Sequence, residues 1–384
     1  MRFRLTEDQR ALRDGVRELL ARRFGQEALR AAVERPGLDR GLWRELGAAG
    51  FFALRLPEAE GGVGLGLPEA VLVFEEAGRA LVPGPLVATH LAAGTVPGAA
   101  TGEAVVTAVG GGGLVEWLAE ADAVVDTAGD VRDAGDLSAT GGLRGAGDLR
   151  EAEGPQEFGE LREAGDLPEA GCLRGTGGQR EIGDVRGTGD VREIGDVRGT
   201  RDVRGTGGRR EAGGPSVAVE VRSVDPLTPL HRVPGGGSDD RLDDLFVLLT
   251  AAEQVGTAVR ACEAAVQHAR TREQFGRPVG AFQAVKHLCA ELLVRVEVAR
   301  AALYAAAVTA DPVDIAVARL LADEAAVRGA RDCLQVHGGM GFTWEADVHL
   351  CLKRAWVRAE RGGSITESEE LLARELLSEA VRPR

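Results

Sequence analysis

The chain has 384 residues, which is enough for two or three domains. Apolar residues make up 44% of the chain but aromatic residues only 4%, so Ala, Leu and Val must build most of the core, a composition that favours helices. The formal net charge is -14, and the arginines are dispersed among acidic neighbours. A nucleic-acid partner is therefore not expected, because a protein that neutralises phosphates needs a basic surface.

The cysteines and residues 1–8 give an indication of the cellular compartment of the protein. The five cysteines lie far apart and none belongs to a CxxC pair, which favours a reduced chain without a disulfide framework or a metal site. Residues 1–8 lack the apolar segment of a secretory signal. No run of about eighteen apolar residues is free of charges, so we expect a cytoplasmic protein without a membrane span.

Residues 1–100 are predicted to form a helical N-terminal domain. Thr6 is suited to cap the first helix, because its hydroxyl can accept a hydrogen bond from the first turn. A glycine-dense loop over residues 56–66 precedes a further helix that carries Glu75 and Glu76. We interpret this loop as a tight turn between helices, since a glycine-rich loop alone is weak evidence of phosphate binding.

Residues 101–235 are predicted to form a degenerate, reduced β middle domain. Short β-like runs occur at residues 104–109, 123–125 and 216–221, and the last of these alternates apolar and polar side chains. The only tryptophan of this region, Trp117, is interpreted as a packing residue.

A hexad-repeat insert at about 129–213 interrupts the middle domain. Gly recurs there every six residues, and only Glu153 and Arg201 break the register. One Val or Leu per hexad buries too little apolar surface to offset chain entropy, so we expect a disordered low-complexity expansion. A left-handed β-helix also has a six-residue period, but it needs a large aliphatic residue in every hexad. The residues that occupy this slot in some hexads include Pro155, Gln179 and Arg209.

Residues 236–384 are predicted to form a C-terminal four-helix bundle. Apolar residues at steps of three and four predict long helices over about 245–266, 285–303 and 312–326, the last opened by a proline. Gly338 and Gly339 are expected to end that third helix. Further helices are expected to start near residues 345 and 364, which makes four or five antiparallel helices.

Two motifs in the C-terminal region resemble the acyl-CoA dehydrogenase family. The first is Arg272-Glu273-Gln274-Phe275-Gly276 with Gln283 seven positions after the Phe, and the second is Gln335-Val336-His337-Gly338-Gly339-Met340-Gly341. The loop at 56–64 followed by Glu75-Glu76 is also similar to the family. The resemblance covers roughly residues 1–100 and 240–380. It implies a mainly α fold in which a β middle domain separates a helical N-terminal domain from a four-helix bundle.

The resemblance also implies FAD as the cofactor and an oligomer, because in this family these motifs hold the ADP half of an FAD bound by a neighbouring subunit. Arg272 would pair with the pyrophosphate, a role that suits a guanidinium. Phe275 and Val279 would contact the adenosine half. The full set of implied cofactor contacts is Arg272, Gln274, Phe275, Val279, Gln283, Gln335, Gly338, Gly339 and Ser364.

The carboxylate base that the family reaction needs is missing from its usual position. The family removes a proton from Cα of an acyl thioester while the flavin takes hydride from Cβ, and a carboxylate must reach that proton. The usual position falls at Gly362 in this chain. A minority position falls at Phe246, which leaves Asp243 and Asp244 as weak candidates about one helical turn away. The other carboxylates considered are Glu253, Glu360 and Glu367.

The family's strand with a tryptophan that covers the flavin ring is not found either. The preferred hypothesis is a base-lacking subunit of a heteromeric acyl-CoA dehydrogenase of lipid metabolism, which completes the FAD site of a base-bearing homologous subunit. The alternatives are a self-sufficient homo-oligomeric enzyme with a relocated base and a non-catalytic scaffold of the same fold. Acyl-CoA or an acyl-carrier thioester would be the substrate, and electron-transfer flavoprotein the electron acceptor.

Overall fold

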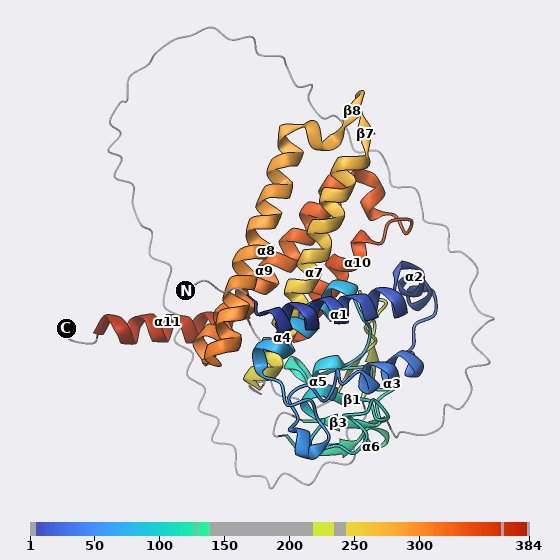
Figure 1. The fold of residues 1–384 in the computed structure, drawn as a ribbon, viewed down its shortest axis with the longest axis vertical. Coiled ribbons are helices and arrows are strands. Elements are labelled where there is room, and N and C mark those ends of the chain that lie inside the picture. The colour runs from blue at the N-terminus through green and yellow to red at the C-terminus, as the bar shows by residue number, and fades with distance from the viewer. Residues whose placement is uncertain (1–4, 127–128, 139–217, 234–242, 362–364, 382–384) are drawn as a thin grey trace, which may run out of the picture. The chain divides into compact units, whose positions relative to one another are not determined.

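The computed structural model of the protein describes residues 5–126, 129–138, 218–233, 243–361 and 365–381 (Figure 1). These residues belong to one compact unit. The structure is mainly helical, with short strands between two helical regions, which confirms the predicted fold class. Gly362 and Ser364 lie outside the described residues.

The N-terminal region is helical, as predicted. Its helices are α1 (Glu7–Arg23), α2 (Gln26–Glu34), α3 (Arg40–Ala48), α4 (Leu67–Ala80) and α5 (Leu86–Leu91), with a 3-10 turn η1 (Glu58–Glu60). Thr6 caps α1, because its hydroxyl accepts a hydrogen bond from the Gln9 backbone N–H at 3.1 Å. The Gln9 side chain accepts one in return from the Thr6 backbone at 3.0 Å.

The middle region contains small sheets rather than a large β domain. One sheet has the order β1 (Val106–Ala108), β3 (Ala123–Val125), β4 (Val131–Asp133); β1 and β3 are parallel, and β3 and β4 antiparallel. The other is antiparallel, in the order β2 (Leu114–Glu116), β6 (Leu230–Arg232), β5 (Val219–Val221). The 3-10 turn η2 (Gly111–Gly113) precedes β2. All three predicted β-like runs contribute a strand.

The start of the hexad tract departs from the prediction. Its first residues form β4 and the short helix α6 (Ala134–Ser138), so this part of the tract belongs to the fold. The physical reason is that Val131 and its neighbours extend an existing sheet, and Ala134 is buried in a small cluster with Val115 and Val124. The rest of the tract, 139–213, lies outside the described residues.

The C-terminal region is built from long helices close to those expected. They are α7 (Asp244–Thr271), α8 (Gln283–Thr309), α9 (Pro312–His337), α10 (Val348–Arg361) and α11 (Ile365–Val381). A hairpin of β7 (Glu273–Gln274) and β8 (Arg277–Pro278) and the 3-10 turn η3 (Val279–Ala281) join α7 to α8. The 3-10 turn η4 (Gly338–Phe342) follows α9, so the two glycines do end that helix.

Helix α7 is the core of the unit. It packs against α4, α8, α9 and α10, and most of its residues between Phe246 and Cys262 are buried. Its length and hydropathy are those of a membrane-crossing helix, but 83% of the relevant window is buried inside the protein, as in a core helix. Gly256 and Gly78 let α7 and α4 cross closely. A Cβ on Gly256 would lie 1.9 Å from the Glu75 carbonyl oxygen, and one on Gly78 would lie 2.1 Å from that of Glu253.

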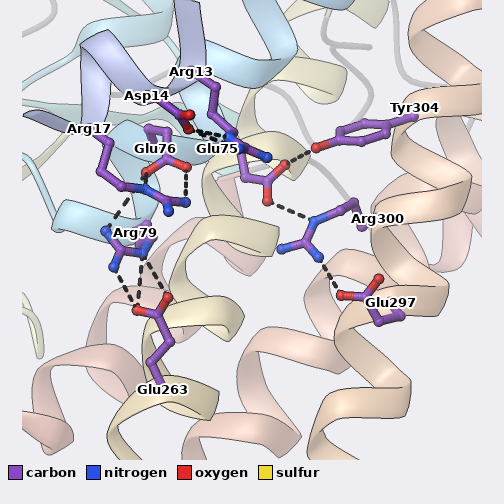
Figure 2. Close-up of polar contacts among 10 residues, drawn as sticks. All are labelled: Arg13, Asp14, Arg17, Glu75, Glu76, Arg79, Glu263, Glu297, Arg300 and Tyr304. Carbon is purple, nitrogen blue, oxygen red and sulfur yellow. Dashed lines mark hydrogen bonds and ion pairs between the residues drawn. The ribbon is translucent and has the colours of Figure 1, made fainter. Parts of the chain in front are cut away.

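Two adjacent buried carboxylates of α4 accept hydrogen bonds from residues of other helices (Figure 2). Glu75 accepts hydrogen bonds from Arg300 Nε at 2.9 Å and from the Tyr304 hydroxyl at 2.8 Å, both on α8. Glu76 accepts hydrogen bonds from Arg17 on α1 at 2.6 and 3.0 Å. The contacts of Glu75 thereby attach α4 to α8 of the bundle, and those of Glu76 attach α1 to α4 by charge-assisted hydrogen bonds.

Candidate cofactor site

The first motif folds as a hairpin at the end of α7. Arg272 caps α7: its N–H donates to the His268 carbonyl at 2.9 Å, and its carbonyl accepts from Val279 N–H at 2.7 Å. The chain turns at Phe275 and Gly276, whose φ angles are 54° and 73°. Two successive residues with positive φ are the signature of the tight hairpin turn that matches strand twist. This turn holds the Phe275 ring outward, where it is 90% exposed.

The polar side chains of this hairpin are available to a ligand. Arg272 is exposed and forms no ion pair or side-chain hydrogen bond within the described part of the chain. The Gln274 amide donates to the neighbouring carbonyl of Glu273, at 2.7 Å. Gln283 opens α8 and lies with its Nε2 at 3.1 Å from His287 Nε2. A cation and two amides therefore face solvent around an exposed aromatic ring.

The second motif ends α9 with backbone that is open to solvent. Gly338 has φ 63°, and its N–H donates to the carbonyl of the exposed Gln335. A Cβ added at Gly338 or Gly339 would meet nothing within 4 Å. Gly341 differs, because a Cβ there would lie 3.1 Å from the Leu334 carbonyl oxygen. Packing thus accounts for Gly341, whereas Gly338 and Gly339 leave bare backbone accessible to a ligand.

The two motifs lie at the same end of the bundle. Their helices meet there through the rings of His268 on α7 and His337 on α9, whose centroids are 4.1 Å apart. His337 Nδ1 lies 2.8 Å from the Cys333 carbonyl oxygen, so this nitrogen carries the proton. Burial, with the neighbouring His337 and Arg272, lowers the pKa of His268. Two imidazole rings in contact therefore hold together residues more than sixty positions apart in sequence.

The candidate carboxylates differ in their surroundings. Asp243 caps α7: its Oδ1 accepts from the N–H groups of Leu245 and Phe246 at 2.7 and 3.3 Å. Asp244 is half-buried in the first turn of α7. Glu253 is buried, and its Oε1 accepts a hydrogen bond from Arg358 Nη2 at 2.9 Å. Burial raises the pKa of Glu253, with Arg358 opposing the shift. Glu360 is exposed in the last turn of α10, and the side chain of Glu367 lies outside the described residues.

A row of buried arginines on α10 lies at the contact between the bundle and the middle region. Arg354 Nε lies 2.5 Å from Asp225, and Arg361 Nη1 lies 2.5 Å from Glu116 of β2. Between them, Arg358 pairs with Glu253, and burial lowers the pKa of Arg358 to about 10. Each arginine has one carboxylate partner, so the row is balanced in charge.

Comparison with known proteins identifies the family. The model of the acyl-CoA dehydrogenase C-terminal domain matches residues 248–377, and that of the N-terminal domain matches residues 6–104. The acyl-CoA dehydrogenase IpdE2 of Mycobacterium tuberculosis is 31% identical over 385 residues, which is 97% of each chain. The chain belongs to the acyl-CoA dehydrogenase family. Members of this family are FAD-dependent oxidoreductases, and the chain is one of them.

Solved structures of acyl-CoA dehydrogenases have the same fold. The ChsE4–ChsE5 complex from Mycobacterium tuberculosis gives a TM-score of 0.68 at 22% identity and covers 100% of both chains. A steroid acyl-CoA dehydrogenase, the Tcur3481–Tcur3483 G363A variant, gives 0.67 at 20% identity and covers 98% of this chain and 99% of the other. The expected acyl-CoA dehydrogenase architecture is therefore confirmed.

The hairpin end of this acyl-CoA dehydrogenase has residues suited to the ADP half of FAD. Arg272 could hold the pyrophosphate with parallel hydrogen bonds, and Phe275 could contact the adenosine half together with the half-buried Val279. Gly338 and Gly339 allow a ligand to approach the backbone without meeting a Cβ. Arg272, Phe275, Gly338 and Gly339 are exposed, so a cofactor held here would lie largely outside this chain's own core.

The middle region is less suited to the flavin ring. Trp117 is 1% exposed, which confirms its interpretation as a packing residue. The hydroxyl of Thr107 donates to the Glu116 carbonyl at 2.6 Å, and that of Thr228 donates to Asp225 Oδ2 at 2.7 Å. These hydroxyls are already engaged within the protein. The ion pair between Arg361 and Glu116 also joins α10 directly to β2.

The arginine row was not found from the sequence, although a signal is present. Arg354, Arg358 and Arg361 are spaced four and three residues apart, which places them on one helical face. A charged helix face is normally exposed to solvent, so the spacing alone predicts that these arginines lie on the protein surface. Only the carboxylates of distant segments, at Asp225 and Glu116, make burial of this face possible.

Proposed function

We propose that this chain is the base-lacking subunit of a heteromeric acyl-CoA dehydrogenase, in which it contributes ADP-side contacts to an FAD held by a base-bearing homologous subunit. The observation that carries the proposal is the outward-facing group of Arg272, Phe275, Gly338 and Gly339 at one end of the bundle. The sequence has glycine, at 362, where the family places its base. The nucleotide half-site is retained and the proton acceptor is not.

The reaction class follows from this division of labour. FAD supplies the acceptor for the hydride that leaves Cβ of the acyl thioester. In this chain Arg272 neutralises pyrophosphate charge, and the bare backbone at Gly338 and Gly339 contacts the nucleotide. The partner supplies the carboxylate that takes the Cα proton. The thioester is one of CoA or of a carrier protein, and electron-transfer flavoprotein is the proposed electron acceptor.

Two observations support a heteromeric assembly. The solved structures with the same fold include two that are named as pairs of different proteins, one of them a steroid acyl-CoA dehydrogenase. In the described part of the chain, each guanidinium of the buried arginine row is paired with a carboxylate, so this row has no excess positive charge that would attract a flavin phosphate. An FAD site shared between this chain and a second, different chain accounts for both observations.

The test is flavin content after co-expression with the product of the adjacent gene. We expect one flavin per two chains in the purified complex and little flavin in this chain alone. Arg272→Ala should lower flavin occupancy of the complex at least tenfold, because a charge-assisted contact to the pyrophosphate is lost. Arg270→Ala is the matched control, since Arg270 is an exposed arginine in the same turn of α7 and should leave occupancy unchanged. Full flavin occupancy in the Arg272→Ala complex would rule out the proposed contact.

A second candidate function rests on Asp243. This residue lines a cavity of about 580 Å³ together with Phe246, the minority base position, so a self-sufficient enzyme could use it as the base. Asp243→Asn is a clean test, because Asn retains the helix cap but cannot accept the proton. If this candidate is right, the chain alone binds flavin and oxidises acyl-CoA, and Asp243→Asn abolishes the oxidation while flavin stays bound.

A further inference from the structure

The second half of α7 borders a cavity of about 550 Å³ that neither function uses. Further lining residues come from α1, α2, α4 and the start of α10. The apolar ones include Leu20, Phe24 and Leu29. Neither Asp243 nor Phe246 lines this cavity, and none of the described residues proposed to contact FAD does. The cavity is within the size range of small-molecule sites.

Three of the four arginines that line this cavity have carboxylate partners. The pairs are Arg17–Glu76, Arg79–Glu263 and Arg30–Asp347. The first two pairs form one network, because Arg79 Nη1 also lies 3.8 Å from Glu76 (Figure 2). A further lining carboxylate, Glu345, is exposed and forms no ion pair with any residue that the structure describes. The buried and half-buried acids of the wall are therefore already engaged.

The fourth arginine, Arg260, has no carboxylate partner in the described part of the chain. It is half-buried on α7, and its Nη1 donates to the Arg79 carbonyl at 3.3 Å. Burial raises the pKa of the Cys351 thiol and the charge of Arg260 opposes this shift, so the guanidinium lies near α10 as well. Arg79 and Cys351 both line the cavity, which places the guanidinium at its wall. A guanidinium has five N–H donors, so most of them are available to an anion.

We propose that this cavity binds a monocarboxylate with an apolar body, whose carboxylate pairs with Arg260. A guanidinium binds a planar carboxylate through two parallel hydrogen bonds. One unpaired cation offsets one negative charge, and the carboxylates of Glu76, Glu263 and Asp347 would repel a second, which disfavours a phosphate monoester. The apolar walls bind the rest of the ligand. This inference goes beyond the proposed function and does not depend on it, because it needs neither flavin nor a partner subunit.

The test compares octanoate and octanamide on the full-length chain by titration calorimetry near neutral pH. The two ligands have nearly the same shape and differ in charge, so the wild type should bind octanoate roughly tenfold more tightly. Arg260→Gln removes the charge but keeps an N–H donor, so it should bind the two ligands equally. Arg260→Lys keeps the charge without the parallel hydrogen bonds and should keep part of the preference. Arg22→Gln is the matched control, since Arg22 is an exposed arginine of α1 outside the cavity.

A measurement on the wild type makes the test independent of how the variants fold. In ¹H–¹⁵N spectra of the arginine side chains, octanoate should move the Nε–H resonance of Arg260 and octanamide should not. The inference is overturned by equal affinity of the wild type for both ligands, by absence of octanoate binding, or by an Arg260→Gln variant that keeps the preference. Arg272→Ala should leave octanoate binding unchanged, so this inference and the proposed function fail separately.

Discussion

Protonation of the buried His90 ring is expected to make the stability of the protein depend on pH. Burial lowers its pKa to about 4, against an ordinary value near 6.5. A group with a lowered pKa in the folded state stabilises the fold above the unfolded pKa, and this contribution is lost as the pH falls through the folded pKa. We therefore expect the wild type to lose roughly 3 kcal/mol of unfolding free energy from this group between about pH 6.5 and 4.

Urea denaturation at several pH values in that window, on the wild type and on His90→Asn, measures the effect. The variant lacks the titrating ring and keeps an amide for the Phe52 carbonyl, so its stability should fall less steeply. Parallel pH profiles for the two proteins would show that His90 does not titrate as inferred.

Substitution of Tyr304 measures how much one buried hydroxyl contributes to the stability of the protein. It donates to Glu75, a buried carboxylate that also binds Arg300 (Figure 2). Tyr304→Phe keeps the ring but removes the donor, so we expect a loss of about 1–3 kcal/mol in unfolding free energy. The control is Glu370→Gln in the exposed pair with Arg374, which should change stability by less than about 0.5 kcal/mol. Similar effects of the two substitutions in denaturant unfolding would contradict this assignment.

At the scale of elements, the crossing of α4 and α7 depends on glycine. A Cβ at Gly256 would lie 1.9 Å from the Glu75 carbonyl oxygen and 2.5 Å from Arg79 N, and neither backbone atom can move alone. Gly256→Ala should therefore force the helices apart and cost roughly 3 kcal/mol or more.

Gly15 provides the matched control for this prediction. It is an exposed glycine within α1, where a Cβ would meet nothing within 4 Å. Gly15→Ala should stabilise the protein by about 0.5–1 kcal/mol, because Ala is the better helix former. Thermal unfolding of both variants measures these changes in stability. A Gly256→Ala variant as stable as the wild type would mean that α4 and α7 cross less closely than described.

The long helices could be predicted from sequence because their signals are local. Pro312 opens α9 with Asp311 as its cap, and Gly338 ends it, all within the chain segment itself. The hairpin between α7 and α8 was recognised only as a motif. The shape of this hairpin depends on a positive φ angle at Phe275. Phenylalanine rarely adopts a positive φ angle, so the residue types alone do not predict a two-residue turn at this position.

At the scale of the whole molecule, the described residues on either side of 139–217 lie next to each other. The N–H of Ala218 donates to the carbonyl of Leu137 at 3.2 Å. Replacement of residues 139–217 by a short Gly/Ser linker is therefore geometrically feasible. We expect the shortened protein to unfold within a few °C of the wild type, because the core contacts of α7 lie elsewhere. Insoluble or unfolded protein after this replacement, judged by circular dichroism, would contradict the prediction.

The candidate site was predicted in part. The residues proposed for the nucleotide, among them Arg272 and Gly338, do lie at one end of the bundle, as their separate motifs implied. The roles of these residues toward FAD remain a prediction that the Arg272→Ala experiment tests. The burial of His90 could not be predicted from sequence, since a lone histidine in an apolar segment does not reveal which carbonyl its ring will meet.

The sequence by itself determined the helices, the family and the absence of a carboxylate at residue 362, because each depends on residue identity or on spacing along one segment. Only the tertiary structure decided which charges are buried and paired. Arg354 meets Asp225, and Glu75 meets Tyr304, across more than a hundred residues of sequence. The physical reason is that burial of a charge is tolerable only beside a partner, and that partner comes from a distant segment that the fold alone brings near.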